Sequence, residues 1–137
     1  MKNVFVKLCI CTMLLLPLVL TAGCNSQKDD SPIANPIEIT ISIDYPDKVE
    51  LTDVEESFKI EENSTVLDAI QLYCNVNEIA LTVETTDGSV NGINGVENNE
   101  LYTNRTWQFT VNGTVSEEPA NTVFLVNGDQ LQWIYKK

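Results

Sequence analysis

The 137-residue chain contains no histidine and few basic side chains, since 8 Lys and Arg face 20 Asp and Glu for a formal net charge of −12. A protein that binds nucleic acid needs a clustered basic face, so we expect no nucleic-acid partner. The absence of histidine removes the commonest metal ligand and the usual acid–base group near neutral pH. We therefore predict no metal site and no Ser-His or Cys-His nucleophile pair.

The chain also lacks a long hydrophobic run. Its most apolar stretch, Leu8–Leu20, follows two lysines and is too short to cross a bilayer comfortably, which is typical of a secretory signal peptide. The stretch ends in Leu20-Thr21-Ala22-Gly23-Cys24, which resembles the lipobox of bacterial lipoproteins. That resemblance implies cleavage before Cys24, acylation of its thiol and anchoring to the cell membrane on the side facing outside the cytoplasm. The alternative is an ordinary signal peptide in which Cys24 is incidental.

These features predict three parts of the chain. Residues 1–23 are the lipoprotein signal peptide, and residues 24–36 are the lipidated cysteine with a flexible tether that has almost nothing to bury. Residues 37–137 form one domain.

That domain also lacks paired cysteines, whose disulfide bonds usually stabilise exported proteins. Of the four cysteines, Cys9 and Cys11 lie in the leader and Cys24 is the predicted lipidation site. Cys74 is left alone in an apolar stretch, where we expect a small buried hydrophobe. The core must then be stabilised by packing alone.

Five segments alternate apolar and polar residues, as strands with one buried face do: 37–44, 56–61, 79–84, 107–111 and 130–135. Residues 66–74 carry apolar side chains at spacings of three and four after the capping residues Asn63–Thr65, which predicts a helix. This order predicts an α+β, β-grasp-like fold, in which a mixed sheet of about five strands packs on one helix.

Residues 87–106 show no such alternation and are predicted to be irregular. Their two Asn-Gly pairs, Asn91-Gly92 and Asn94-Gly95, predict tight turns. An EF-hand loop could begin at Asp87, but the position that requires a bidentate glutamate holds Asn98. The segment therefore does not change the expectation that no metal is bound.

Catalytic motifs are absent as well. The sequence has no phosphate-binding Gly-rich motif and no nucleophile elbow, and nothing in the spacing of the carboxylates selects a catalytic pair. We predict that the protein is not an enzyme.

Four segments in order resemble the bacterial domain that is similar to the C-terminal β-domain of transcobalamin and intrinsic factor. They are Ser64–Ile70, Val90–Gly95, Trp107–Gly113 and Asn127–Trp133, and the resemblance covers residues 37–137. In the vertebrate carriers this β-domain closes over one face of cobalamin, while a helical domain holds the other face. The resemblance implies a small-ligand-binding domain, with cobalamin or a related corrinoid as the leading ligand.

The matching motif positions imply that a ligand lies near Gly92–Gly95, Trp107, Gln108 and the hairpin Asn112–Ser116. An aromatic side chain in the loop at Tyr102 also suggests a binding surface. The candidate binding residues are therefore Gly92, Asn94, Gly95, Tyr102, Trp107, Gln108, Asn112 and Thr114.

Several of these candidates and their neighbours in the motifs have a structural explanation as well as a functional one. Trp107 and Trp133 are in phase with the apolar residues of their strands, which favours core packing. Gln108 and Thr110 face the opposite side, toward a ligand or toward water. The Asn-Gly pairs are favoured by backbone geometry alone.

Together these features predict an exported, membrane-anchored lipoprotein that binds a small ligand and carries no other cofactor. The alternative is a non-catalytic cell-surface module whose loops or sheet edge bind a protein partner or a glycan.

The lipid anchor can be tested directly. We expect Cys24→Ala to leave the protein unlipidated and uncleaved at this site, because acylation requires the thiol. Intact-mass spectrometry of membrane fractions measures both effects. Acylation that persists in the variant would refute the assignment.

Overall fold

A computed structural model describes residues 32–136. The predicted signal peptide, Cys24 and the tether up to residue 31 lie outside the described residues. Within the described part, none of the helices is long and apolar enough to cross a membrane. The described residues form one compact unit.

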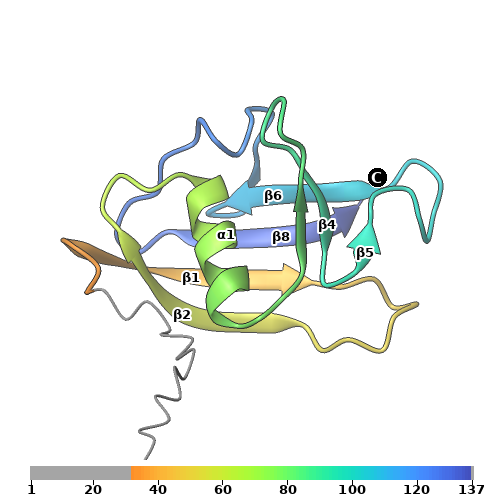
Figure 1. The fold of residues 1–137 in the computed structure, drawn as a ribbon, viewed down its shortest axis with the longest axis horizontal. Coiled ribbons are helices and arrows are strands. Elements are labelled where there is room, and N and C mark those ends of the chain that lie inside the picture. Colours follow the sequence, from red (N-terminus) through yellow and green to blue (C-terminus); the bar gives the residue numbers. More distant parts are fainter. Residues whose placement is uncertain (1–31, 137) are drawn as a thin grey trace, which may run out of the picture. The chain divides into compact units, whose positions relative to one another are not determined.

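The larger of two sheets contains five strands in the order β2-β1-β8-β6-β7 (Figure 1). The first and last strands, β1 and β8, run parallel to each other in its middle, while the other neighbours are antiparallel. The sheet is therefore mixed, as predicted. Its strands are β1 (Pro36–Asp44), β2 (Val54–Glu61), β6 (Thr106–Val111), β7 (Thr114–Val115) and β8 (Gln130–Lys136).

One face of this sheet forms the core because the strands alternate. Ile41 and Ile43 of β1 are fully buried and lie opposite Leu131 and Trp133 of β8. Phe109 of β6 lies opposite Trp133 on the other side. Burying such side chains contributes about 1.5–3 kcal/mol each relative to exposure, so the alternation fixes the register.

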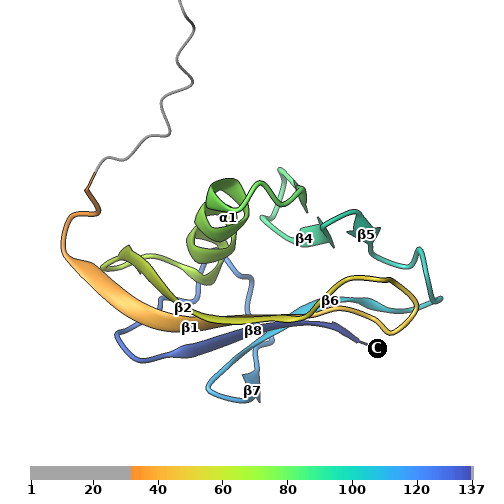
Figure 2. The same cartoon turned by 90° about the horizontal axis from the view of Figure 1, so that it is seen from below.

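A single helix, α1 (Val66–Val76), covers part of that face (Figure 2). Its five buried residues recur at the spacing of one helical stripe. Thr65 caps the helix: its hydroxyl accepts a hydrogen bond from the Asp68 backbone N–H, and the Asp68 carboxylate accepts one from the Thr65 N–H. The buried stripe consists of Val66, Ala69, Ile70, Tyr73 and Cys74.

A second sheet of three short strands lies on the same side of the large sheet as the helix (Figure 2). It consists of β3 (Leu81–Val83), β4 (Val90–Ile93) and β5 (Val96–Glu97). The turn between β4 and β5 is Asn94-Gly95, and both residues have positive φ, 54° and 80°. This matches the two-residue hairpin turn that an Asn-Gly pair favours.

The α+β fold with a mixed sheet on one helix is confirmed, but two details differ from the sequence prediction. The strand expected at residues 79–84 belongs to the second sheet, and β7 takes the fifth place in the large one. Residues 87–106 include β4 and β5, which are too short to show alternation. The pair Asn91-Gly92 is not a turn, because it lies inside β4, where Gly92 makes room for the Glu97 side chain of β5.

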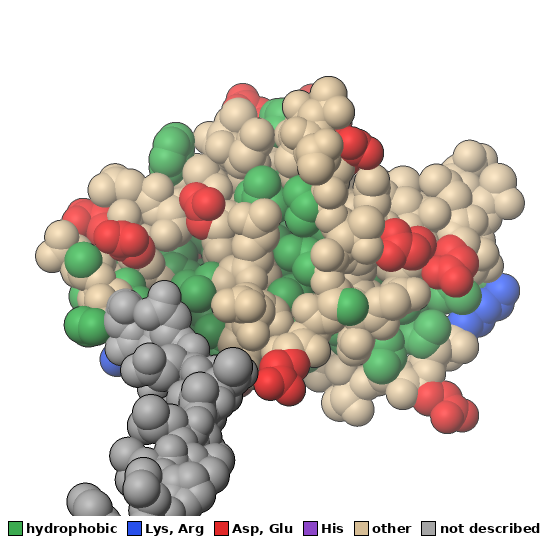
Figure 3. Space-filling model, viewed as in Figure 1, with side chains coloured by type: hydrophobic (Ala, Val, Ile, Leu, Met, Phe, Trp, Pro, Cys, Tyr) green, Lys and Arg blue, Asp and Glu red, His purple; other side chains and the backbone are tan. Residues whose placement is uncertain are grey.

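Acidic side chains are spread over the face of the molecule that carries the helix, whereas basic ones show only at its edges (Figure 3). Hydrophobic side chains reach the surface in the hollow beside the helix. This surface has the charge expected from the sequence, and it disfavours polyanionic partners.

The helix cap gives a test of the fold. Thr65→Ala removes the oxygen that accepts from the Asp68 N–H, so we expect it to lower the free energy of unfolding by about 1 kcal/mol. Thr65→Ser keeps the oxygen and should cost much less. Urea unfolding measures both variants, and equal stability of Thr65→Ala and the parent would contradict the capping role.

Candidate functional site

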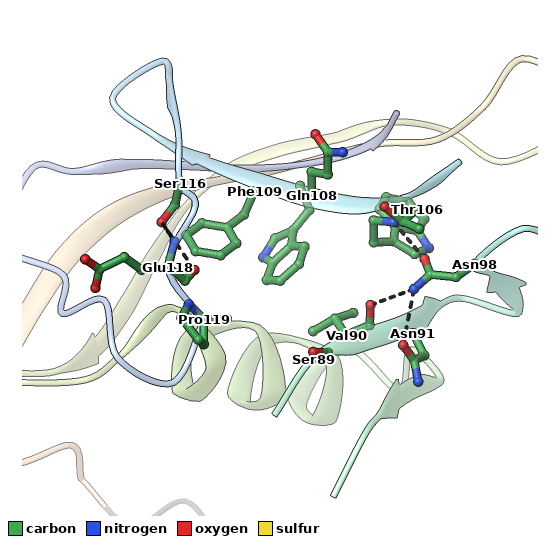
Figure 4. A pocket seen from close by; sticks show the side chains of 13 residues that line it. Ser89, Val90, Asn91, Asn98, Thr106, Gln108, Phe109, Ser116, Glu118 and Pro119 are labelled. Carbon is green, nitrogen blue, oxygen red and sulfur yellow. Dashed lines mark hydrogen bonds between the residues drawn. The ribbon is translucent and has the colours of Figure 1, made fainter. Parts of the chain in front are cut away.

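A cavity of about 360 Å³ opens on the core face of the large sheet, between the second sheet and the segment 116–120 (Figure 4). One wall is β6, and a second is β4 together with Asn98, which follows β5. A third wall is the segment 116–120, which links β7 to the long loop before β8. The volume lies at the small end of the range for ligand pockets.

The apolar part of the cavity is made by Trp107, Phe109 and Trp133. These side chains come from β6 and β8 and are 6%, 7% and 2% exposed. The rings of Phe109 and Trp133 lie 5.3 Å apart, and Trp107 packs edge-on against Tyr45 and Tyr135. Each of the three rings is therefore packed against at least one other aromatic ring.

The two indole N–H groups differ in their hydrogen bonds. Trp107 donates through Nε1 to the backbone oxygen of Val96 at 2.7 Å. Trp133 Nε1 is buried and has no hydrogen-bond partner among the described residues. An unpaired buried donor costs roughly 1–3 kcal/mol, and the Tyr45 hydroxyl, outside the lining, is a second buried polar group without a partner among the described residues.

Asn98 joins the polar side of the cavity to its aromatic side (Figure 4). Its side-chain oxygen accepts from the Trp107 backbone N–H at 2.7 Å. Its amide nitrogen donates to the Val90 backbone oxygen at 3.3 Å and to Asn91 Oδ1 at 3.2 Å. Asn98 thus ties β4 to β6 and fixes the width of the cavity.

The segment 116–120 is held to the helix and closes the third side. The Leu67 N–H of α1 donates to the Ala120 backbone oxygen at 2.9 Å. Ser116 accepts from the Glu118 N–H at 3.1 Å, which shapes the turn (Figure 4). The exposed Glu118 carboxylate is the charged group of the lining.

Two of the predicted binding residues, Trp107 and Gln108, line this cavity. The side chain of Gln108, however, points to the opposite side of β6 from Phe109 (Figure 4). This agrees with the alternation read from the sequence. The backbone of Gln108, rather than its amide group, therefore lies beside the cavity.

Three other candidates belong to the β4–β5 hairpin. Gly92 packs against the Glu97 carboxylate, so a side chain at this position would collide with it. Asn94 and Gly95 are exposed at the turn and lie outside the cavity lining. Their geometry is accounted for by the hairpin.

Tyr102 is half-buried and also lies outside the lining. The Lys48 Nζ lies 4.1 Å from the centre of its ring, and the Arg105 Cζ lies 4.5 Å from it. The aromatic ring is thus occupied by two cation–π contacts, which stabilise the loop by about 0.5–1 kcal/mol each at exposed sites.

The last two candidates lie in the β6–β7 hairpin, away from the cavity lining. Asn112 adopts φ 52° in the turn, donates to Asp129 Oδ1 at 2.8 Å and accepts from the Gln130 N–H at 3.0 Å. Thr114 pairs with Val111 at the edge of the sheet. The sequence prediction therefore missed most of the cavity. For Trp133 the sequence favoured core packing over ligand contact, Phe109 was not singled out from its strand, and no sequence pattern marks Asn98.

Reactive side chains are not gathered at the cavity. The residues that the structure describes include no group of three or more Cys, Asp or Glu placed to hold a metal ion. Cys74 is 2% exposed, and burial raises the pKa of its thiol to about 11. It is therefore a thiol at neutral pH, not a nucleophilic thiolate.

Residues 63–137 match the family described as "Domain of unknown function (DUF4430)". Because the match covers more than half of the 137 residues, the chain belongs to that family. The sequence matches no curated protein.

Two solved structures share the fold. Haptocorrin in complex with Cbi superposes with a TM-score of 0.59 at 14% identity, over 77% of this chain and 26% of the haptocorrin chain. This chain thus spans about a quarter of haptocorrin. A Ruminococcus gnavus protein with the provisional description of a metal-binding protein superposes with a TM-score of 0.51 at 14% identity, over 74% of this chain and 97% of its own. At these identities the likeness concerns the fold.

The Asn98 contacts can be tested through stability. We expect Asn98→Ala to lower the free energy of unfolding by roughly 2 kcal/mol, since it leaves the Trp107 N–H and the Val90 carbonyl without these partners. Asn91→Ala loses just one of the same bonds and should cost clearly less. Thermal or urea unfolding compares the two, and equal costs would argue against Asn98 as the link between β4 and β6.

Proposed function

We propose that the domain binds a small ligand in the cavity between β6, β4 and the segment 116–120, and that the first candidate ligand is a corrinoid. The observation that carries the proposal is the cavity itself, which has aromatic side chains inside, polar ones at its edge and a buried donor that no described residue pairs with. Concave, mostly apolar spaces with a few placed polar groups are the usual ligand sites of proteins.

The size of the cavity limits how a corrinoid would bind. About 360 Å³ accommodates a substituent of the macrocycle and not the whole ring. The ring would then lie across the mouth of the cavity, with one face against the domain. Such a pose is in keeping with a domain that corresponds to about a quarter of haptocorrin, which was solved with Cbi.

We also propose that the domain acts outside the cytoplasm, held to the membrane through acylated Cys24. The basis is the lipobox-like sequence before Cys24 and the polar residues that follow it. In this setting the protein is a non-catalytic binding module. Its negative charge keeps it soluble and away from anionic lipid headgroups.

A second candidate function, contact with a surface protein partner, is favoured by a separate observation. Phe124 and Val126 are each 64% exposed on the loop before β8, while Leu125 between them is buried. The backbone of Leu125 is fixed by a hydrogen bond to Ser64. Two apolar side chains held outward in this way are typical of a protein contact.

Titration with cobalamin and with cobinamide tests the first function. We expect either corrinoid to quench tryptophan fluorescence in a saturable way, because Trp107 and Trp133 are the two tryptophans of the chain and both line the cavity. Absence of quenching and of any change in corrinoid absorbance at millimolar ligand would reject corrinoid binding.

A matched pair of variants locates the binding. Ser89→Tyr places a bulky side chain at an exposed position of the lining and should weaken binding at least tenfold. Thr85→Tyr lies in the same loop outside the lining and should leave the affinity within about twofold. Equal affinities of the two variants would place the ligand elsewhere.

A further inference from the structure

We propose that the indole N–H of Trp133 is a ligand-binding donor, and that it selects an uncharged carbonyl or carboxamide oxygen inserted into the cavity. This inference rests on the proposed function and specifies the chemical group that the cavity recognises. It does not depend on the ligand's being a corrinoid.

The first argument is the contrast between the two tryptophans. Both side chains are more than nine-tenths buried and line the same cavity. The Val96 backbone oxygen satisfies the Trp107 donor at 2.7 Å, whereas none of residues 32–136 supplies a partner for Trp133 Nε1. Burying a donor without a partner destabilises the fold, so an acceptor that reaches Trp133 recovers that free energy on binding.

The second argument concerns charge. The lining contains no lysine or arginine, and its charged side chain is the Glu118 carboxylate at the rim. A carboxylate ligand would lose its hydration and meet an acidic group without a counter-ion. A neutral carbonyl offers the same acceptor oxygen without that cost, so the site discriminates against anions.

The third argument concerns the surroundings of the donor. Phe109 packs against the Trp133 ring, and Val90 and Pro119 contribute further apolar surface to the lining. In Figure 4 the side chains of Phe109 and Pro119 lie on the same side of β6. The group that enters is thus expected to be a compact apolar one that ends in a single acceptor.

Nuclear magnetic resonance gives a direct test, because the full chain has two indole N–H signals. We would record them for the full-length 15N-labelled chain in detergent micelles, with benzamide and benzoate as probes. These probes have nearly the same shape but differ in charge. The signals are assigned with Trp133→Phe, which removes one of them.

We expect the unbound Trp133 signal to lie upfield of the hydrogen-bonded Trp107 signal. Benzamide should move it downfield by at least three times the shift of Trp107, and benzoate should bind at least tenfold more weakly. A Trp133 signal that benzamide leaves in place, or equal binding of the two probes, would overturn the inference.

A variant pair adds a second readout. Trp133→Phe keeps an aromatic ring but removes the donor, so benzamide affinity should fall about fivefold, the equivalent of one neutral hydrogen bond. Thr85→Val, at an exposed position outside the cavity lining, should leave that affinity unchanged. If Trp133→Phe fails to fold, the two indole signals of the parent chain are assigned instead from their through-space contacts, Trp107 with Val96 and Trp133 with Phe109, and their shifts decide the question.

The two proposals can fail separately. If cobinamide does not bind but benzamide moves the Trp133 signal, the corrinoid proposal is rejected and the donor assignment stands. If a corrinoid binds and leaves the Trp133 signal unmoved, the donor assignment is rejected alone.

Discussion

The parallel pairing of β1 with β8 is the contact on which the rest of the domain depends. It joins the beginning of the folded chain to its end, in the middle of the sheet, and it places Ile41 and Ile43 against Leu131 and Trp133. Parallel strands cannot be joined by a tight turn, so a long intervening chain must connect them. Part of that chain, β2, β6 and β7, pairs in the same sheet, and the helix, the second sheet and the segment 116–120 contact the core face.

The cavity follows from the way the helix lies on the sheet. In Figure 1 α1 runs across the strands and not along them, so it covers just part of the length of a nine-residue strand such as β1, which extends about 30 Å. One helix therefore leaves part of the aromatic face of β6 and β8 uncovered. The second sheet and the segment 116–120 cover most of the remainder, and the space where they meet is the candidate binding site.

The two tryptophans show how similar sequence signals take different roles. Trp107 and Trp133 occupy equivalent phases of their strands, and both were expected in the core, which the structure confirms. Their indole nitrogens differ because the backbone of β5 offers an acceptor to Trp107, whereas no described residue offers one to Trp133. The same side chains thus belong to the core and to the candidate site. The alternation of apolar and polar residues cannot tell these two roles apart.

The sequence by itself determined the α+β class, the long strands, the helix with its cap at Thr65 and the tight turn at Asn94-Gly95. These features depend on periodicity and on local backbone geometry, and both are set by residues that are a few positions apart in the sequence. Only the tertiary structure decided that β3 pairs with β4, that Asn98 bridges two sheets and that Tyr102 is covered by cations. Those outcomes depend on contacts between distant segments, whose positions are set by packing and not by local sequence.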